Sequence, residues 1–520
     1  MKAGAVNARR VMQTPAFIRN TPDSGSRWGR LRGAVRRVVT ASACALAVAA
    51  VWAAPAHGAF PYLPASGGDA NDPTTFKLPA GEVPNDLGDD YKFAATPENS
   101  AASNALNNSK QDELCGVRGA SIADQNATFP AGTNSCIAAG SPVKTAWQTS
   151  TGRPDVTLAV LDSGIEWNDA GAMSDLRHKV RLNQGELPKP NANRATPLDG
   201  SKACNLFDTT KYDANGDGVV NVTDYACDDR VHDVNAESPN RAGPNGVLTP
   251  EDITIAFSTA PGYGGIDNDG NGYVDDVAGW DFVDNDNDPY DDVHYAHGTG
   301  EAKGSNGEAN NGGALGTCPN CTVLPLRVGE SFVADVNRFA QAVTYATDNN
   351  VLVVQEALGT LNNSLFARQA LDYAYNHGVT VIASAADEAA EHHNQPSELP
   401  HVIVVNSVTK YADISGVQFT PTTPSYLEFN GCTNFSPKIT IAVPSSSCSS
   451  EATERSAGVA GLIYSAAINA NVPASTDCTR PDGSACRITP NEVRQLIATG
   501  RVGSTEAADT GTSGAQTDDV

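Results

Sequence analysis

The sequence contains few basic residues for its length. Its 35 Lys and Arg residues stand against 60 Asp and Glu residues, so the 520-residue chain has a formal net charge of −25 at pH 7. Such a chain repels the phosphates of nucleic acid, and we expect no nucleic-acid partner. An excess of acid favours bound cations instead, and much of the acid in this chain is clustered.

Long apolar runs are also scarce, and the one near the N-terminus belongs to a targeting signal. Basic residues, among them Arg36 and Arg37, precede an Ala-rich apolar run at 38–54, which Pro55 and small residues follow. This order predicts a signal peptide over 1–58 and a secreted protein, extracellular or periplasmic. The run is slightly short for a membrane span, so we expect no stable span in the mature chain.

A complete zinc site of the CxxC type is absent. Cys318 and Cys321 form the only CxxC pair, so we interpret it as a tight structural bridge, with a zinc half-site and a redox pair as alternatives. Cys44 lies in the signal peptide, and the even number of remaining cysteines in an exported chain predicts disulfides. Pairing of sequence neighbours is the simplest arrangement of these ten residues: Cys115, Cys136, Cys204, Cys227, Cys318, Cys321, Cys432, Cys448, Cys478 and Cys486.

From residue 157 onward, short and nearly continuous apolar runs predict strands buried on both faces. The runs occupy 157–162, 323–328, 351–358, 379–386, 401–408 and 439–444. Apolar residues at helical spacing between several of them, at 336–347 and 366–377, predict helices, and Gly378 is placed as a C-cap. The alternation predicts an α/β fold: a doubly wound, mostly parallel sheet with helices on both faces. Functional residues are then expected at the carboxyl ends of the strands.

An acidic insertion between the first two predicted strands contains a loop with calcium-binding spacing. Oxygen-bearing side chains stand at loop positions 1, 3, 5, 9 and 12, Gly218 stands at position 6, and the Val219 carbonyl adds a ligand at position 7. The side chains are those of Asp213, Asn215, Asp217, Asn221 and Asp224. This spacing predicts a structural Ca²⁺ site, against the alternative of a solvated turn cluster.

A second loop repeats the start of that pattern. Its predicted ligands are Asp267, Asp269, Asn271 and Asp275. Residues 267–292 contain ten Asp and no Lys or Arg. Because such a density of like charge repels itself unless it is neutralised, we expect a second bound Ca²⁺ here.

Three residues of the types needed for nucleophilic catalysis lie where strands end or helices begin. Asp162 ends the first predicted strand, His297 precedes small residues that can start a helix, and Ser450 opens a small-residue helix. An Asp, a His and a Ser are the set needed for an oriented, base-activated hydroxyl. Helix N–H groups beside such a serine can stabilise an oxyanion.

The segments around these residues resemble the three catalytic blocks of subtilisin-like serine proteases. They read LAVLDSGI, GWDFVDNDNDPYDDVHYAHGTG and SSEATERSAGVAGLIYSAA, in the family's order of Asp, His and Ser. The resemblance implies that Asp162 orients His297, that His297 is the general base, and that Ser450 attacks the scissile carbonyl. It also implies that Ala357, Leu358 and Gly359 pair with the substrate backbone. The neighbouring Glu356 is expected to disfavour acidic substrates.

The sequence departs from the family pattern beside the chemistry. Glu301 and Glu454 replace apolar family residues, and Asp387 occupies the position of the asparagine that donates to the oxyanion. An ionised Asp387 repels a developing negative charge, whereas a protonated one can donate to it. Nearby acids, Glu356, Glu388 and Glu451, are expected to favour the protonated form. A GTSGA segment at 511–515 also matches the serine block but lies at the end of the chain, and we set it aside.

Two hypotheses follow. The first is a secreted, calcium-stabilised serine endopeptidase that cleaves polypeptides and acts as a monomer. The second is a catalytically impaired pseudo-protease that serves as a calcium-dependent binding or adhesion module. The predicted domain organisation is a signal peptide at 1–58, an N-terminal extension or pro-segment at 59–140, a peptidase domain at 141–500 with an insertion at 200–293, and a low-complexity end at 501–520.

Overall fold

The computed structural model describes residues 60–79, 84, 143–234, 246–311, 313–332, 334–409, 428–445 and 448–499. Backbone contacts divide the chain into the units Met1–Ala53 and Ala54–Val520, and every described residue belongs to the second. The predicted signal peptide, most of the N-terminal extension, Cys115, Cys136 and residues 501–520 lie outside the described residues.

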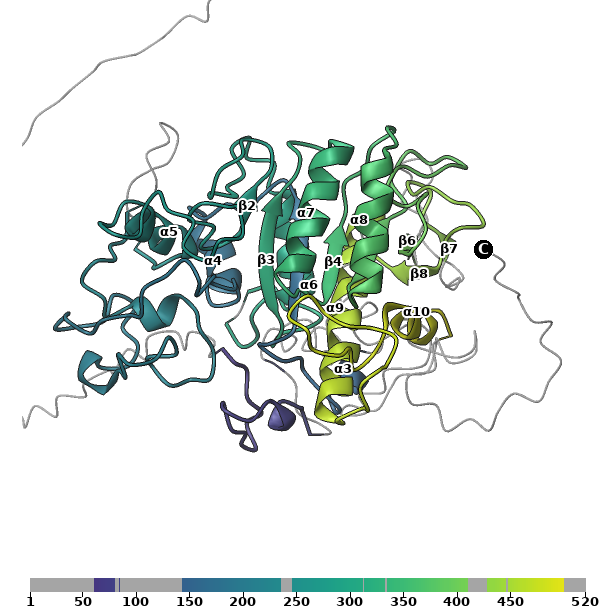
Figure 1. The fold of residues 1–520 in the computed structure, drawn as a ribbon. Coiled ribbons are helices and arrows are strands. Elements are labelled where there is room, and N and C mark those ends of the chain that lie inside the picture. Colours follow the sequence, from purple (N-terminus) through teal and green to yellow (C-terminus); the bar gives the residue numbers. More distant parts are fainter. Residues whose placement is uncertain are drawn as a thin grey trace, which may run out of the picture. The chain divides into compact units, whose positions relative to one another are not determined.

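A parallel β-sheet forms the centre of the described structure (Figure 1). Each of the six predicted apolar runs contains a strand: β1 Thr157–Asp162, β3 Thr322–Arg327, β4 Val353–Glu356, β5 Thr380–Ser384, β6 Val402–Thr409 and β8 Ile441–Pro444. Two short strands, β2 Trp280–Asp281 and β7 Glu428–Phe429, were not predicted. The order is β2-β3-β1-β4-β5-β6-β7, with β8 also on β6, and only the β6–β7 pair is antiparallel. The predicted mostly parallel α/β sheet is therefore confirmed.

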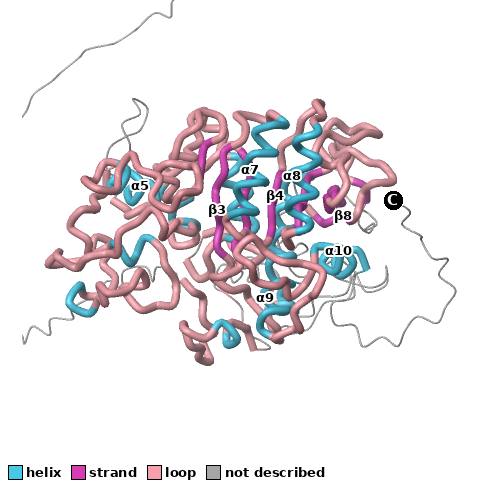
Figure 2. The backbone as a smooth tube through the Cα atoms, viewed as in Figure 1, coloured by secondary structure: helices cyan, strands magenta, loops and turns pink. Residues whose placement is uncertain are grey.

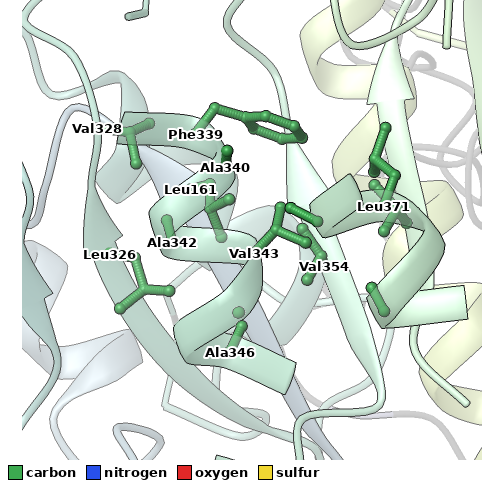
Figure 3. Close-up of a cluster of buried hydrophobic side chains, with 14 of the residues drawn as sticks. Leu161, Leu326, Val328, Phe339, Ala340, Ala342, Val343, Ala346, Val354 and Leu371 are labelled. Carbon is green, nitrogen blue, oxygen red and sulfur yellow. The ribbon is translucent and has the colours of Figure 1, made fainter. Parts of the chain in front are cut away.

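Helices cover both faces of the sheet. The α-helices are α3 Val143–Ala146, α4 Ala170–Leu176, α5 Pro250–Ser258, α6 His297–Asn306, α7 Val336–Asp348, α8 Leu365–Asn376, α9 Ser449–Asn469 and α10 Pro490–Thr499, and the short 3₁₀ helices are η1 Pro73–Thr75, η3 Cys204–Leu206 and η4 Val222–Tyr225. Alternate residues of β4 point to opposite faces: Val354 joins a core with α7 and α8 (Figure 3), whereas Val353 joins one with α9. Both faces are buried, as the continuous apolar runs predicted.

The region between β1 and β2 is built mostly of loops (Figure 2). It carries a separate apolar core around Trp167, Tyr225 and Phe257. Among the described residues, no helix is both long enough and apolar enough to cross a bilayer.

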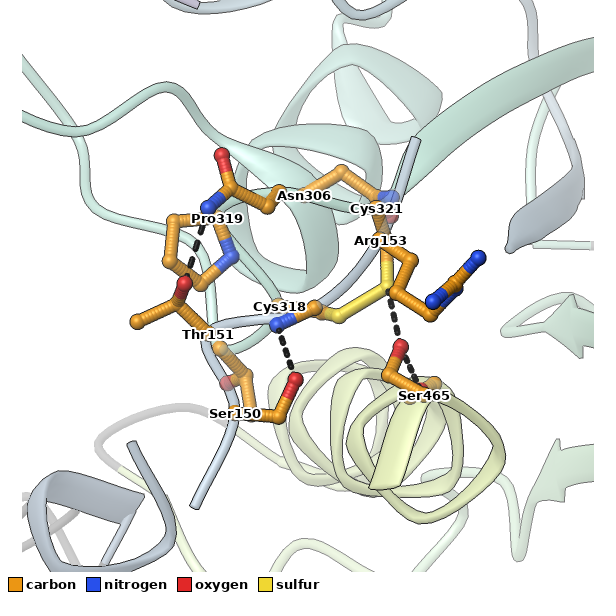
Figure 4. The surroundings of a disulfide bond; sticks show 12 residues. Ser150, Thr151, Arg153, Asn306, Cys318, Pro319, Cys321 and Ser465 are labelled. Carbon is orange, nitrogen blue, oxygen red and sulfur yellow. Dashed lines mark hydrogen bonds between the residues drawn. A yellow bond between two sulfur atoms is a disulfide. The ribbon is translucent and has the colours of Figure 1, made fainter. Parts of the chain in front are cut away.

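Four disulfides join sequence neighbours, which confirms the predicted pairing for those cysteines. They are Cys204–Cys227, Cys318–Cys321, Cys432–Cys448 and Cys478–Cys486. Cys318 and Cys321 are fully buried and pack beside α9 near Ser465 (Figure 4). A Cβ atom on Gly152 would lie 2.5 Å from the Cys318 sulfur. The CxxC pair is thus a structural bridge, as interpreted.

Position 378, at the end of α8, requires a glycine for two reasons. Its φ of +80° lies in the left-handed region that the predicted C-cap requires. In addition, a Cβ atom there would lie 2.5 Å from the sulfur of Cys486, so the Cys478–Cys486 bridge packs directly on the bare backbone.

Candidate active site

Asp162 and His297 meet at the carboxyl end of the central strand β1. Asp162 is the last residue of β1 and is 1% exposed, and His297 is the first residue of α6. The Nδ1 atom of His297 lies 2.9 and 3.0 Å from the two carboxylate oxygens of Asp162. Burial lowers the pKa of His297, but the adjacent Asp162 carboxylate outweighs it and the net shift is upward. The pair has the geometry of an oriented base.

Two features fix the start of α6 against β1: Asp291, which the sequence analysis did not single out, and one of the small residues predicted to allow a closely packed helix. The buried Asp291 accepts hydrogen bonds from the backbone N–H groups of Tyr295 and Ala296 and from the Ser163 hydroxyl, at 3.1, 2.6 and 3.0 Å. A Cβ atom on Gly298 would lie 2.5 Å from the Gly164 carbonyl oxygen. The glycine after His297 thus permits the approach that brings the imidazole to Asp162.

Ser450 is the second residue of α9, close to the helix N-terminus. Its side chain is mostly buried, and its hydroxyl lies 3.5 Å from the Ala357 carbonyl oxygen, the longest separation at which it can donate. Within the described part of the chain, no hydrogen bond joins the Ser450 hydroxyl to the His297 imidazole. The structure therefore contains the Asp–His pair, and the serine hydroxyl is turned toward β4. Catalytic hydrogen bonds are often incomplete before substrate binds.

Asp387 follows β5 and lies at the N-terminus of α9. Its Oδ1 atom accepts hydrogen bonds from the backbone N–H and the hydroxyl of Ser449, at 2.9 and 2.6 Å. Burial raises the pKa of Asp387 against these two bonds, and the charge of Glu388 adds to the rise. Burial, rather than the predicted cluster of acids, is the main cause: Glu451 is paired with Arg455 at 2.6 Å.

Three glutamates lie buried around the catalytic helices. Glu356, the last residue of β4, is 1% exposed, and its predicted effect on acidic substrates stays a prediction. Glu301 stands one turn after His297 and accepts a 2.9 Å bond from Gln355. Glu454 stands one turn after Ser450, and its carboxyl lies over the backbone of Gly304 in α6. We call Glu301, Glu356 and Glu454 the buried carboxyl set. Burial raises the pKa of Glu301 and of Glu356 well above the ordinary value.

The first predicted calcium loop closes on itself. The Asp213 carboxylate accepts bonds from the N–H groups of Gly216, Asp217 and Gly218. Burial raises the pKa of Asp224 to about 8, and the charges of Asp217 and Asp213 add to the rise. Hydrogen bonds from the backbone of Asn221 and Asn215 lower it, but by less. Asn215 also bonds Asp217, and the Val219 N–H donates to Asp217. Of the three acidic side chains, Asp224 is buried and Asp213 and Asp217 are half-buried, and the three do not form one of the converging acidic groups found among the described residues, so the Ca²⁺ site of this loop stays a prediction.

The second loop gathers a partly different set of ligands from the predicted one. Carboxylate oxygens of Glu186, Asp269 and Asp276 lie within 4.8 Å of one another. Asn271 lies beside them and donates to Asp276 at 2.8 Å. Two predicted ligands have other partners: Asp267 accepts N–H groups of its own loop, and Asp275 accepts the Gly265 N–H. Glu186 lies far away in sequence, and no motif pointed to it. Burial raises the pKa of Asp276 to about 7.

Three further Asp residues of the segment 267–292 pair with a basic residue from outside it. Arg327, the last residue of β3, is 1% exposed and lies 2.5, 2.8 and 3.2 Å from the carboxylates of Asp281, Asp284 and Asp292. For these three residues Arg327 supplies positive charge, and the predicted second Ca²⁺ of the segment stays a prediction. The segment itself has no Lys or Arg, but the sheet topology brings one to it.

The chain belongs to the subtilase family. The model of that family matches residues 153–516, which include β1, α6 and α9. The resemblance inferred from the three sequence blocks is thereby confirmed.

Individual relatives match shorter parts of the chain. A thermophilic serine proteinase of Bacillus sp. (strain AK1) is 34% identical over 140 residues, covering 26% of this chain and 34% of that protein. Thermitase of Thermoactinomyces vulgaris is 32% identical over 193 residues, covering 36% of this chain and 67% of that protein. The match thus spans about a third and about two thirds of their lengths. A solved cold-adapted subtilisin-like serine proteinase aligns at 22% identity with a TM-score of 0.32, covering 45% of this chain and 76% of that chain.

Proposed function

We propose that this protein is a secreted, calcium-stabilised serine endopeptidase with Asp162, His297 and Ser450 as its triad. The observation that carries the proposal is the two-oxygen contact of Asp162 with His297 Nδ1 at the carboxyl end of β1. That contact leaves Nε2 of the imidazole as the atom that accepts a proton. Family membership and the placement of Ser450 at the start of α9 support it.

The reaction requires one rotation of the Ser450 side chain, from the Ala357 carbonyl toward His297. The Ser450 oxygen then bonds to the scissile carbonyl carbon while its proton moves to Nε2 of His297. When the C–N bond breaks, that proton passes to the leaving amine, and an acyl-enzyme remains. Water repeats the sequence with His297 as base and releases the acid. Asp162 holds the imidazole and stabilises its charged form.

Asp387 supports an acid-shifted oxyanion site. Ser449 occupies its Oδ1 atom through two hydrogen bonds, so Oδ2 is the oxygen available to carry a proton and donate it. Two pH dependences then oppose each other. His297 must be neutral to act as base, so its raised pKa favours higher pH, whereas a protonated Asp387 favours lower pH.

Calcium and secretion are part of the same proposal. Asp213, Asp217 and Asp224 would hold one Ca²⁺ ion, and Glu186, Asp269 and Asp276 would hold another. Bound Ca²⁺ would supply positive charge that holds each loop together. The four disulfides support an oxidising destination. A polypeptide substrate follows from the proposed activity.

A fluorophosphonate probe, which reacts with an activated serine, tests the proposal. The mature chain is labelled at pH 4.5 and 7.5 in calcium, beside a Ser450→Ala variant and, as the matched control, a variant of the exposed Ser484, Ser484→Ala. We expect labelling that Ser450→Ala abolishes and Ser484→Ala retains. Because protonation of His297 also weakens labelling at pH 4.5, the role of Asp387 is read from the ratio of Asp387→Asn labelling to wild-type labelling at each pH. A ratio that is larger at pH 7.5 supports a protonated Asp387 as donor, and an equal ratio at both pH values contradicts that role.

A second candidate function is the pseudo-protease that binds partners without efficient catalysis. The contact of the Ser450 hydroxyl with Ala357, rather than with His297, favours it. Absence of Ser450-dependent labelling at both pH values, from a chain shown to be folded by circular dichroism, would establish this alternative.

A further inference from the structure

The backbone edge assigned to substrate pairing is occupied by the chain itself. The N–H of Gly359 donates to the Phe332 carbonyl at 3.0 Å, and the N–H of Ala334 donates to the Gly359 carbonyl at 2.9 Å. Ala357, Leu358 and Gly359 are all buried. We call residues 329–332 and 334, which follow β3, the strap. Both hydrogen-bonding groups of Gly359 are therefore already used.

The position of Ser450 shows which substrate residue would otherwise pair with Gly359, where the strap now lies. The hydroxyl lies 3.5 Å from the Ala357 carbonyl, so the residue that donates the scissile carbonyl lies opposite Ala357. In an antiparallel pair, residues two apart on one strand face residues two apart on the other. The residue two positions upstream of the scissile one therefore lies opposite Gly359. Its backbone has no free partner there.

The side chain of Phe332 lies over the catalytic base. Its ring centroid is 5.3 Å from that of Tyr295 and 6.0 Å from that of His297, edge-on to both, and Phe332 as a residue is 61% exposed. Tyr295 is itself stacked on His297 at 5.2 Å. These ring contacts hold the strap at the acyl side of the site. There it lies beside the substrate residue that precedes the one with the scissile carbonyl.

We propose that Phe332 and Ala334 are specificity-determining residues that limit the acyl side of the substrate to two residues. The inference rests on the proposed serine-peptidase chemistry and revises its endopeptidase assignment, because it favours bonds near the amino terminus over internal bonds. The preferred substrates are peptides cut close to their amino terminus, because a third upstream residue must compete with the strap for Gly359. In an open edge, the same third residue would gain two backbone hydrogen bonds.

A substrate series with a constant leaving group measures this limit. Peptide p-nitroanilides with one, two, three and four alanines are compared by kcat/KM. We expect kcat/KM to rise from one alanine to two and then to stay level or fall. A rise of about tenfold or more from two alanines to four, which two added hydrogen bonds would give, overturns the inference.

Two variants open the edge in different ways. Ala334→Pro removes the N–H that bonds Gly359, and Phe332→Ala removes the ring contacts while leaving that N–H in place. We expect each to raise kcat/KM for the four-alanine substrate about tenfold relative to kcat/KM for the two-alanine substrate. Phe366→Ala, which removes a partly exposed ring on α8, is the matched control and should change neither. Equal changes for both substrates in the strap variants contradict the inference.

Hydrogen–deuterium exchange separates failure of this inference from failure of the proposed function. If no substrate is hydrolysed in a Ser450-dependent way, the peptidase proposal fails, and exchange still reports on the strap. We expect the amides of Gly359 and Ala334 to exchange slowly in the wild-type chain and faster in the Phe332→Ala variant. Fast exchange of both amides in the wild-type chain overturns the closed edge.

Discussion

The acidic insertion and the buried carboxyl set contain the same chemical group in different surroundings. In the insertion, carboxylates converge in loops rich in backbone N–H donors or surround Arg327. Near the catalytic helices, the charges that act most strongly on Glu301 are those of Glu454 and Asp162, and both are negative. The proposed Ca²⁺ ions and the Arg327 guanidinium would keep the acids of the insertion ionised, whereas burial and negative neighbours raise the pKa of Glu301 and favour its protonated form. Different perturbations should reveal the difference.

The largest expected effect is loss of the Arg327 guanidinium, which lies on β3 and pairs with acids of the insertion. Arg327→Met leaves the buried Asp281 without its partner, so we expect the free energy of unfolding at pH 7 to fall by about 3–5 kcal/mol. Urea unfolding measures it. Arg368→Met removes an exposed guanidinium and should cost less than about 0.5 kcal/mol. Equal losses in the two variants would mean that Arg327 does not neutralise the cluster.

Chelation of calcium should have the next largest effect. At a free Ca²⁺ concentration of 100 times Kd, a bound ion stabilises the fold by about 2.7 kcal/mol, which EGTA should remove. Without the ion, the pKa of Asp224 is raised to about 8. The protonated Asp224 side chain therefore contributes its full stability to the fold at acid pH, and this contribution is lost as the pH rises toward 8. The EGTA-induced fall in Tm should thus be small at pH 5 and large at pH 8.5. In an Asp224→Asn variant, the EGTA-induced fall in Tm should be much smaller. If that fall is as large as in the wild-type chain, the ion binds elsewhere.

The buried carboxyl set should respond to pH in a way that no chelator alters. Because the folded-state pKa of Glu301 is raised, Glu301 contributes stability below its unfolded pKa and loses it as pH rises through the folded value. Glu301→Gln should therefore raise the free energy of unfolding at pH 8 by about 1–3 kcal/mol and change it little at pH 4. Urea titrations at the two pH values, with the exposed Glu391→Gln as control, measure this. A uniform loss of stability would instead indicate a packing role.

The smallest effect should come from an exposed acid of the Arg327 cluster. Asp284 is 56% exposed although it lies 2.8 Å from the guanidinium. Water already solvates its carboxylate, so Asp284→Asn should cost less than about 1 kcal/mol. Urea unfolding of Asp284→Asn is measured beside that of Arg327→Met. A larger loss of unfolding free energy in Asp284→Asn would show that burial of Arg327 alone does not set the strength of the cluster.

The sheet could be predicted from the sequence because each principal strand is a continuous apolar run. β1 and β6 lie within a residue of their predicted ranges. β2 and β7, with two residues each, are too short to show a pattern, and they form because longer strands provide their partners. Helix α9 was visible from its small residues, which let it pack closely on the sheet.

The candidate site could be predicted only in part. The types and order of Asp162, His297 and Ser450 carry chemical information, so the sequence could propose them as a triad, and the structure brings Asp162 and His297 together. Contacts between residues distant in sequence leave no pattern in the sequence. Arg327 reaches Asp281 only because β2 pairs with β3. Glu186 reaches Asp276 only through the fold of the loops. The closure of Gly359 by the strap is likewise a matter of loop conformation, which no residue pattern encodes.

The Cys432–Cys448 bridge bears on how the protein should be produced. Cys448 is the N-cap of α9 and lies two residues before Ser450, so the bridge tethers the chain at the start of the helix that carries the proposed nucleophile. A recombinant chain made in a reducing cytosol, or assayed in dithiothreitol, would lack that tether. Expression in an oxidising compartment, with a thiol count before any kinetic experiment, is therefore the appropriate preparation of this protein.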